Sequence, residues 1–262
     1  GSNVHGRGLK MKPLVEDVEA FELVNAKGEL LTCDRKENPE LFKLAIGGYG
    51  LLGMIYSVTL RLTRRQKVRR VVKVIKLEEF LPAIEKRVEE GFTFGDFQYD
   101  IDEKSDTFMR RGVFSCYQPV ADDVPVPEEQ RELGHEEWLK LILLAYVDRK
   151  KVFNTYADYY LSTSGQTYWS DTHQMSVYID DYRKFIDEKT GRKTPSSLMI
   201  SELYAPRDKL TEFMNEAREI LIKRGTWVIY GTIRLIEKDD ETFLPWAKER
   251  YACVIFNLLV EH

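Results

Sequence analysis

The chain has 262 residues, of which 43% are hydrophobic and 31% are charged, so it is long enough to bury a core in one or two domains. Its formal net charge of −4 does not provide the basic footprint expected of a nucleic-acid-binding protein. The longest unbroken apolar run, residues 141–147, is too short for a transmembrane helix.

The first part of the chain predicts a hairpin, a helix and a strand in that order. An apolar segment is interrupted by a turn at residues 25–28 and then resumes. Residues 38–46 predict a helix, with Asn38 as its N-cap and Pro39 in its first turn. Residues 54–62 alternate with the period of a strand.

Four glycines lie in residues 47–53, between this helix and this strand. Gly48, Gly50 and Gly53 match the GxGxxG pattern of dinucleotide-binding folds, but that motif requires a strand before it and a helix after it. Here the order is reversed, which excludes a Rossmann fold. Two interpretations remain: a backbone without Cβ atoms against which a flat ligand can lie, or a plain helix-to-strand turn.

The rest of the chain predicts an α+β fold with helices on one face of an antiparallel sheet. Residues 67–76 are rich in lysine and arginine, and we interpret them as a solvated strand or inter-domain linker that leaves the first domain, with a phosphate site as the alternative. The later predicted elements are a helix at 77–88, strands at 94–101, 107–117 and 197–204, a helix at 209–223, and strands at 226–236 and 251–260.

Residues 128–186 form a helical insert that is rich in aromatic side chains. Aromatic stripes at helical spacing usually pack in a core, while a lid over a substrate is the alternative. The aromatic residues are Trp138, Tyr146, Phe153, Tyr156, Tyr159, Tyr160, Tyr168, Trp169, Tyr178, Tyr182 and Phe185.

Other catalytic motifs are absent from the sequence. There is no nucleophile elbow and no phosphate-binding lysine motif, and the four histidines lack metal-ligand spacing, so no metal site is predicted. Cys33, Cys116 and Cys253 are far apart in apolar segments. We expect buried free thiols, a reducing compartment and a cytoplasmic location.

The order of motifs in residues 3–62 resembles the second half of the FAD-binding (PCMH-type) domain of the vanillyl-alcohol oxidase superfamily. These motifs are a His-Gly turn, the hairpin around "AKGE", the helix "NPELFKLAIGG" and the segment "GLLGMIYSVTLRL". The sugar-1,4-lactone and alditol oxidase branch looks most similar. The resemblance implies that FAD is contacted by His5, Gly6, Gly48, Gly50, Gly53 and Ile55.

A second block, "SELYAPRDKLTEFMNEAREIL" with "YGTIRLIEKDDETFLPWAKERYACVIFNLLVEH", resembles the substrate domain of the same branch. Arg234 matches an arginine that approaches the flavin, and a surface salt-bridge arginine is the alternative. Strand alternation places Thr232 and Arg234 on one face. The alditol branch has a glutamate where Thr232 stands, so Glu202 and Asn257 are further catalytic candidates on neighbouring strands.

The resemblance implies two domains and a redox function. Residues 1–67 would be the C-terminal half of an FAD-binding domain, and residues 68–262 a substrate domain. The implied protein is an FAD-dependent oxidoreductase that accepts hydride from a hydroxylated carbon of a sugar lactone, alditol or related alcohol. A non-catalytic ligand-binding or interaction module and a flavin-dependent C=C reductase are the alternatives.

The same resemblance covers only the middle of the family. The pyrophosphate-binding loop and the histidine that attaches the flavin lie outside these residues, and Gly1-Ser2 looks like a tag remnant. We therefore expect a chain truncated at both ends that carries little or no FAD by itself. We also expect that its uncovered apolar surface favours a homodimer.

Overall fold

The computed structural model describes residues 3–4, 6–173, 179 and 182–262. The chain divides into two compact units, Gly1–Arg64 with Leu235–Tyr251, and Arg65–Arg234 with Ala252–His262. The first unit thus includes the segment Leu235–Tyr251, which lies far along the sequence from its other residues. The assignment of the units as a flavin domain and a substrate domain stays a prediction.

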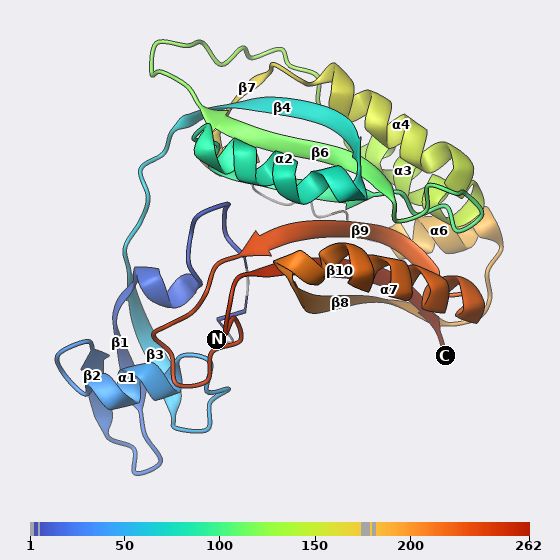
Figure 1. Cartoon of the computed structure of the whole chain (residues 1–262). Helices are drawn as coiled ribbons and strands as arrows, with labels where there is room; N and C mark the ends of the chain where they lie inside the picture. The colour runs from blue at the N-terminus through green and yellow to red at the C-terminus, as the bar shows by residue number, and fades with distance from the viewer. Residues whose placement is uncertain (1–2, 5, 174–178, 180–181) are drawn as a thin grey trace. The chain divides into compact units, whose positions relative to one another are not determined.

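The first unit contains a small sheet in the strand order β2-β1-β3, with both pairings antiparallel. The predicted hairpin, helix and following strand are all present (Figure 1). In chain order, the elements are η1 (Leu14–Asp17), β1 (Val18–Val24), β2 (Leu30–Asp34), α1 (Pro39–Ala45) and β3 (Met54–Leu60).

The core of this unit lies between α1 and the small sheet. Phe21 on β1 and Phe42 on α1 stack with ring centroids 5.4 Å apart, and both are buried. Asn38 precedes α1 as predicted, but its side chain does not cap the helix. Its Nδ2 instead donates to the carbonyl oxygen of Thr32 at 2.7 Å, because Asn38 has a left-handed backbone with φ 48°.

The second unit contains a seven-stranded antiparallel sheet in the order β7-β4-β6-β5-β9-β10-β8. The α+β fold class is therefore confirmed. The strands are β4 (Lys67–Lys76), β5 (Phe94–Tyr99), β6 (Arg111–Pro119), β7 (Thr167–Trp169), β8 (Ser196–Pro206), β9 (Trp227–Ile236) and β10 (Tyr251–Glu261).

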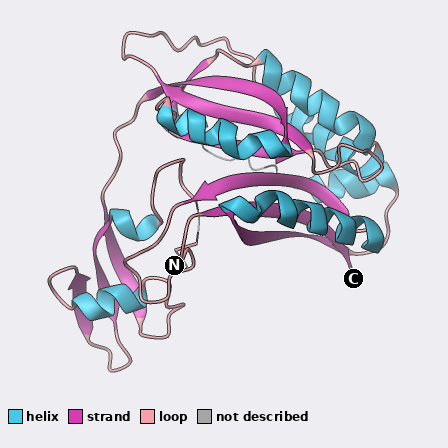
Figure 2. Cartoon of the chain, in the orientation of Figure 1, coloured by secondary structure: helices cyan, strands magenta, loops and turns pink. Residues whose placement is uncertain are grey.

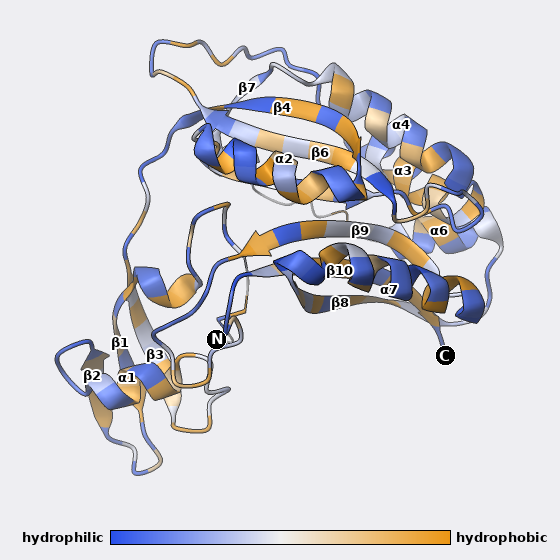
Figure 3. Ribbon diagram, in the orientation of Figure 1, coloured by the Kyte–Doolittle hydropathy of each residue, from blue (hydrophilic) through white to orange (hydrophobic). Residues whose placement is uncertain are grey.

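The interpretation of residues 67–76 as a solvated strand or inter-domain linker is right about the extended backbone and wrong about the solvation of one side. They form β4, which lies inside the sheet between β6 and β7. Val68, Arg70 and Val72 are buried, and bands of hydrophobic and hydrophilic residues alternate along the strand (Figure 3). The basic residues misled the prediction because the buried side of this strand itself carries an arginine.

Helices pack on both faces of the large sheet, whereas the sequence predicted one covered face. α2 (Leu77–Glu89) and α7 (Leu210–Arg224) lie on the same side (Figure 1). On that side the Phe80 ring packs 5.1 Å from Phe97. On the opposite side, Phe153 and Ala157 of α4 (Arg149–Ser162) pack against Val72 and Val113.

The predicted insert follows a long loop after β6 (Figure 2). Besides α4 and β7, it contains α3 (His135–Val147), α5 (Ser170–His173) and the start of α6 (Tyr182–Thr190), and η2 (Arg207–Lys209) precedes α7. No helix among the described residues is long and apolar enough to cross a membrane. All three cysteines are buried free thiols, as predicted.

Candidate active site

One face of the large sheet carries a cluster of polar side chains, which we call the polar face. Directly paired residues of antiparallel strands project from the same side, and the pairs Arg70↔Tyr117, Asp96↔Ser115 and Gln98↔Thr232 join four neighbouring strands. The polar face therefore consists of Arg70, Asp96, Gln98, Ser115, Tyr117, Thr232 and Arg234. The aromatic side of β5, with Phe97, lies on the α2 side.

Asp96 is the carboxylate of the polar face. Its Oδ2 accepts hydrogen bonds from Gln98 Nε2 at 2.9 Å and from Thr232 Oγ1 at 3.4 Å. Burial raises the pKa of this carboxyl, although the positive charge of Arg234 and the two hydrogen bonds act in the opposite direction. A carboxylate thus reaches Thr232 from the neighbouring strand.

Arg70 is a site residue that the sequence analysis missed. Only 2% of its surface is exposed, and its guanidinium lies 4.8–5.4 Å from the ring centroids of Tyr117, Tyr160 and Tyr168. Its Nε donates to the Tyr117 hydroxyl at 3.0 Å and its Nη1 to Thr163 Oγ1 at 2.6 Å. Such desolvated cation–π contacts hold the cation rigidly. The alternation of Val68, Arg70 and Val72 is the signal that could have revealed it.

The insert contributes tyrosines to the polar face. The Tyr156 hydroxyl donates a short hydrogen bond to Gln98 Oε1, and the Tyr156 and Tyr160 rings lie 4.5 Å apart. Burial raises the pKa of both hydroxyls, which therefore stay protonated and neutral. Tyr156 and Tyr160 pack against the same hydrophobic cluster as Phe153, so the core interpretation of the insert holds for these three residues. The lid over a substrate stays a prediction.

Arg234, Asn257 and Glu202 lie on the adjacent strands β9, β10 and β8. Burial raises the pKa of the Cys253 thiol on β10 to about 12, with Glu202 raising it further and Arg234 lowering it. Glu202 and Arg234 therefore both lie near Cys253. Asn257 is four residues further along β10, and its buried Oδ1 has no hydrogen-bond partner among the described residues. The structure does not join Asn257 to the other two candidates.

The residues that the resemblance assigns to the cofactor belong to the first unit. His5 lies outside the described residues. A Cβ on Gly6 would lie 2.9 Å from the Leu235 oxygen, and one on Gly48 would lie 2.5 Å from the Leu44 oxygen. Ile55 packs against the core of the first unit.

The turn after α1 offers one open position. A Cβ on Gly53 would clash with Leu23 and Val24 at 2.5 Å. A Cβ on Gly50, where φ is 82°, would have no neighbouring atom within 4 Å. The turn follows the C-terminal end of α1, so no helix N-terminus is available there to bind phosphates. Gly50 thus leaves open space beside the turn, and the described residues of the turn do not fit the pyrophosphate of FAD.

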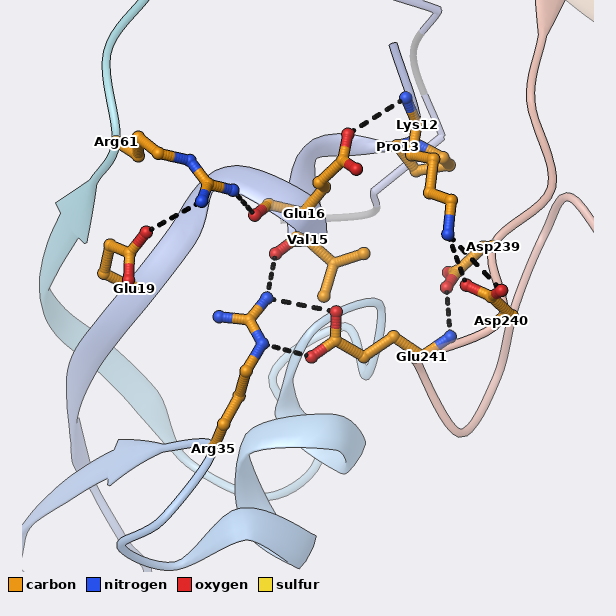
Figure 4. Close-up of a pocket in the computed structure, with 10 residues that line it drawn as sticks. All are labelled: Lys12, Pro13, Val15, Glu16, Glu19, Arg35, Arg61, Asp239, Asp240 and Glu241. Carbon is orange, nitrogen blue, oxygen red and sulfur yellow. Dashed lines mark hydrogen bonds and ion pairs between the residues drawn. The ribbon is translucent and has the colours of Figure 1, made fainter. Parts of the chain in front are cut away.

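A charged pocket of about 370 Å³ lies within the first unit (Figure 4). Arg35 Nε pairs with Glu241 at 2.7 Å, and Lys12 Nζ pairs with Asp240 at 3.1 Å. These contacts bind the segment 235–251 to the rest of the unit, and we interpret the pocket as structural. Its lining residues are Lys12, Pro13, Val15, Glu16, Glu19, Arg35, Arg61, Asp239, Asp240 and Glu241.

No family model matches the chain. Parts of it are similar to curated proteins: cytokinin dehydrogenase 4 of Oryza sativa subsp. japonica is 32% identical over 95 residues, which are 36% of this chain and 18% of that protein. D-arabinono-1,4-lactone oxidase of Debaryomyces hansenii is 35% identical over 80 residues, 30% of this chain and 14% of that protein.

Mitochondrial L-galactono-1,4-lactone dehydrogenase of Brassica oleracea is 36% identical over 75 residues, which are 29% of this chain and 12% of that protein. The matched segments thus span less than a fifth of these three relatives. The sugar-lactone enzymes agree with the motifs of the sequence, whereas the cytokinin dehydrogenases were not expected. About a third of the chain is therefore homologous to FAD-linked oxidases of the vanillyl-alcohol oxidase superfamily.

Proposed function

We propose that the protein is an FAD-dependent oxidoreductase that removes hydride from a hydroxylated carbon of a sugar lactone, alditol or related alcohol. The observation that carries this proposal is the position of Arg234 on the polar face, two residues along β9 from Thr232, which pairs with Gln98 of β5. The partial homology to a lactone oxidase and a lactone dehydrogenase supports the same reaction class.

The groups of the polar face suit the oxidation of an alcohol. Bound FAD supplies a two-electron acceptor for the hydride. A guanidinium held by a strand can stabilise the negative charge that develops on an acceptor, and we assign this role to Arg234. The neutral hydroxyls of Tyr156 and Tyr160 lie in desolvated surroundings, where hydrogen bonds to substrate oxygens are strong.

The first prediction tests Arg234 in the protein loaded with FAD. Arg234→Ala should slow flavin reduction by about 10²-fold or more, the scale for losing one preorganised group that stabilises developing charge. Arg234→Lys should recover part of the rate because it keeps the charge and loses the planar fork. The measurement is anaerobic stopped-flow absorbance with a panel of lactones and alditols.

Arg69→Ala is the matched control, because Arg69 is an exposed arginine of β4 in the same sheet and lies outside the polar face. It should leave the reduction rate unchanged. Normal reduction of the Arg234→Ala variant would remove Arg234 from the mechanism. A wild-type flavoprotein that binds these compounds without any flavin reduction would favour a non-catalytic binding module.

A further inference from the structure

Asp96 has one carboxylate oxygen that the fold does not use. Oδ2 accepts the hydrogen bonds of Gln98 and Thr232, whereas no described residue donates to Oδ1. Asp96 is half-buried as a residue, so its surface is not fully covered by the described residues. Although protein surrounds the carboxylate closely, Oδ1 can therefore accept a hydrogen bond from a ligand.

The groups that face Asp96 come from four strands or helices. The cations are Arg234 on β9 and Arg70 on β4. The Asp96 charge also acts on the Cys116 thiol of β6 and on the hydroxyls of Tyr117, Tyr156, Tyr160 and Tyr230. Each of these groups thus interacts electrostatically with the Asp96 carboxylate, which lies among neutral hydroxyls and aromatic rings.

We propose that Asp96 is a catalytic residue whose Oδ1 binds the hydroxyl group of the reacting substrate carbon and accepts its proton. This inference rests on the proposed function and assigns the group that accepts the hydroxyl proton in that reaction. The substrate class that fits is an uncharged compound with a hydroxyl on the reacting carbon and further hydroxyls or a ring face that contact the tyrosines. A ring face of a sugar packs well on aromatic side chains.

The step balances as follows. The C–H bond of the substrate breaks, and its electron pair leaves with the hydrogen to the two-electron acceptor. The O–H bond breaks, its proton moves to Asp96 Oδ1, and a C=O bond forms. Gln98 and Thr232 are positioning residues, because their hydrogen bonds to Oδ2 orient the carboxylate and stabilise its ionised form.

The second prediction tests this assignment in the protein loaded with FAD by measuring flavin reduction across a pH series. The wild-type rate should fall in acid as Asp96 becomes protonated. Asp96→Asn should lower the rate about 10²- to 10⁴-fold, the usual contribution of a positioned base, and should abolish that acid limb. Asp158→Asn, which changes an exposed carboxylate of α4, is the control and should change neither.

Thr232→Val supplies a readout that does not depend on losing the carboxylate. It removes one hydrogen bond to the ionised form of Asp96, so the acid limb should move to higher pH while the rate on the alkaline plateau is largely kept. A merely structural role of Thr232 would not move the limb. This variant also decides the matter if Asp96→Asn does not fold.

Stability provides a third readout, independent of turnover. Burial raises the folded-state pKa of Asp96 above its unfolded value, so the folded state holds the proton more tightly. Ionised Asp96 therefore destabilises the fold, and the effect is absent in acid and grows as the pH rises through the raised pKa. The stability of Asp96→Asn relative to wild type should therefore increase as the pH rises from acid through the raised pKa of Asp96.

Two results would contradict the proposal in distinguishable ways. If the wild type reduces its flavin with a lactone or alditol and Asp96→Asn keeps the rate and the acid limb, Asp96 is not the proton acceptor and the proposed function stands. If no hydroxylated compound of the panel reduces the wild-type flavin, the proposed function fails and this assignment fails with it.

Discussion

Gly53 shows at the scale of one residue why the turn after α1 contains so many glycines. Its backbone has φ 143°, a conformation that residues with a side chain rarely adopt. A Cβ there would also lie 2.5 Å from Leu23 Cδ2 and from the Val24 oxygen. The packing of β1 thus requires a glycine at this position, whatever else binds nearby.

The third prediction concerns this position. Gly53→Ala should destabilise the first unit by about 3 kcal/mol, since backbone strain and overpacking each cost about 1–3 kcal/mol. Hydrogen–deuterium exchange of the β1 amides would report the loss. Gly28→Ala is the control, because Gly28 has φ 80° but nothing within 4 Å, and should cost about 1 kcal/mol. Equal effects of the two substitutions would contradict the packing argument.

At the scale of an element, β3 exposes an apolar stripe. Met54, Tyr56, Val58 and Leu60 alternate along the strand with 66%, 70%, 51% and 40% of their surfaces exposed. β3 is an edge strand in the described order β2-β1-β3. A contiguous exposed apolar face on an edge strand is a surface for association. The sequence prediction of uncovered apolar surface on the first lobe is confirmed for this strand.

The fourth prediction follows from this stripe. Residues 1–262 should self-associate as the protein concentration rises. The double substitution Met54→Lys with Val58→Lys should lower the association constant at least about tenfold, because losing one side chain from a buried contact costs about 1–2 kcal/mol. Sedimentation velocity would measure it. Ile220→Lys with Ile222→Lys adds the same charge on exposed positions of α7 and is the control. Equal reductions in both variants would point to net charge instead.

At the scale of the whole molecule, the two units divide the predicted site residues between them. The residues assigned to FAD that the structure describes lie in the first unit, and Arg234, Glu202 and Asn257 lie in the second. The first unit has open space at Gly28 and Gly50 and an apolar strand face, while the charges of its pocket pair with one another. It therefore provides no cradle for a pyrophosphate in the described residues.

The fifth prediction is that residues 1–262 by themselves bind little or no FAD, because tight dinucleotide binding requires the phosphates to be neutralised. The purified chain should show almost no flavin absorbance, and FAD should scarcely raise its melting temperature, since only a ligand bound to the native state adds stability. Riboflavin is the matched ligand control without phosphates. A yellow chain with nearly stoichiometric flavin would contradict this prediction.

The sequence by itself determined the elements and the partial family relationship. The spacing of Leu77, Phe80 and Ile84 produces α2 because those side chains fall on one helical face, and all three are buried. Strand alternation placed Thr232 and Arg234 on one face, where the structure has them. Both results follow from local periodicity, which can be recognised in a short stretch of the sequence.

Only the tertiary structure decided which of these residues meet. Asp96 and Thr232 are 136 residues apart and come together through the pairing of β5 with β9, which no local pattern specifies. Arg70 looked solvated because its charge is normally costly to bury, and only the surrounding tyrosines and Thr163 make its burial tolerable. The segment 235–251 joined the first unit through ion pairs between residues more than 200 positions apart.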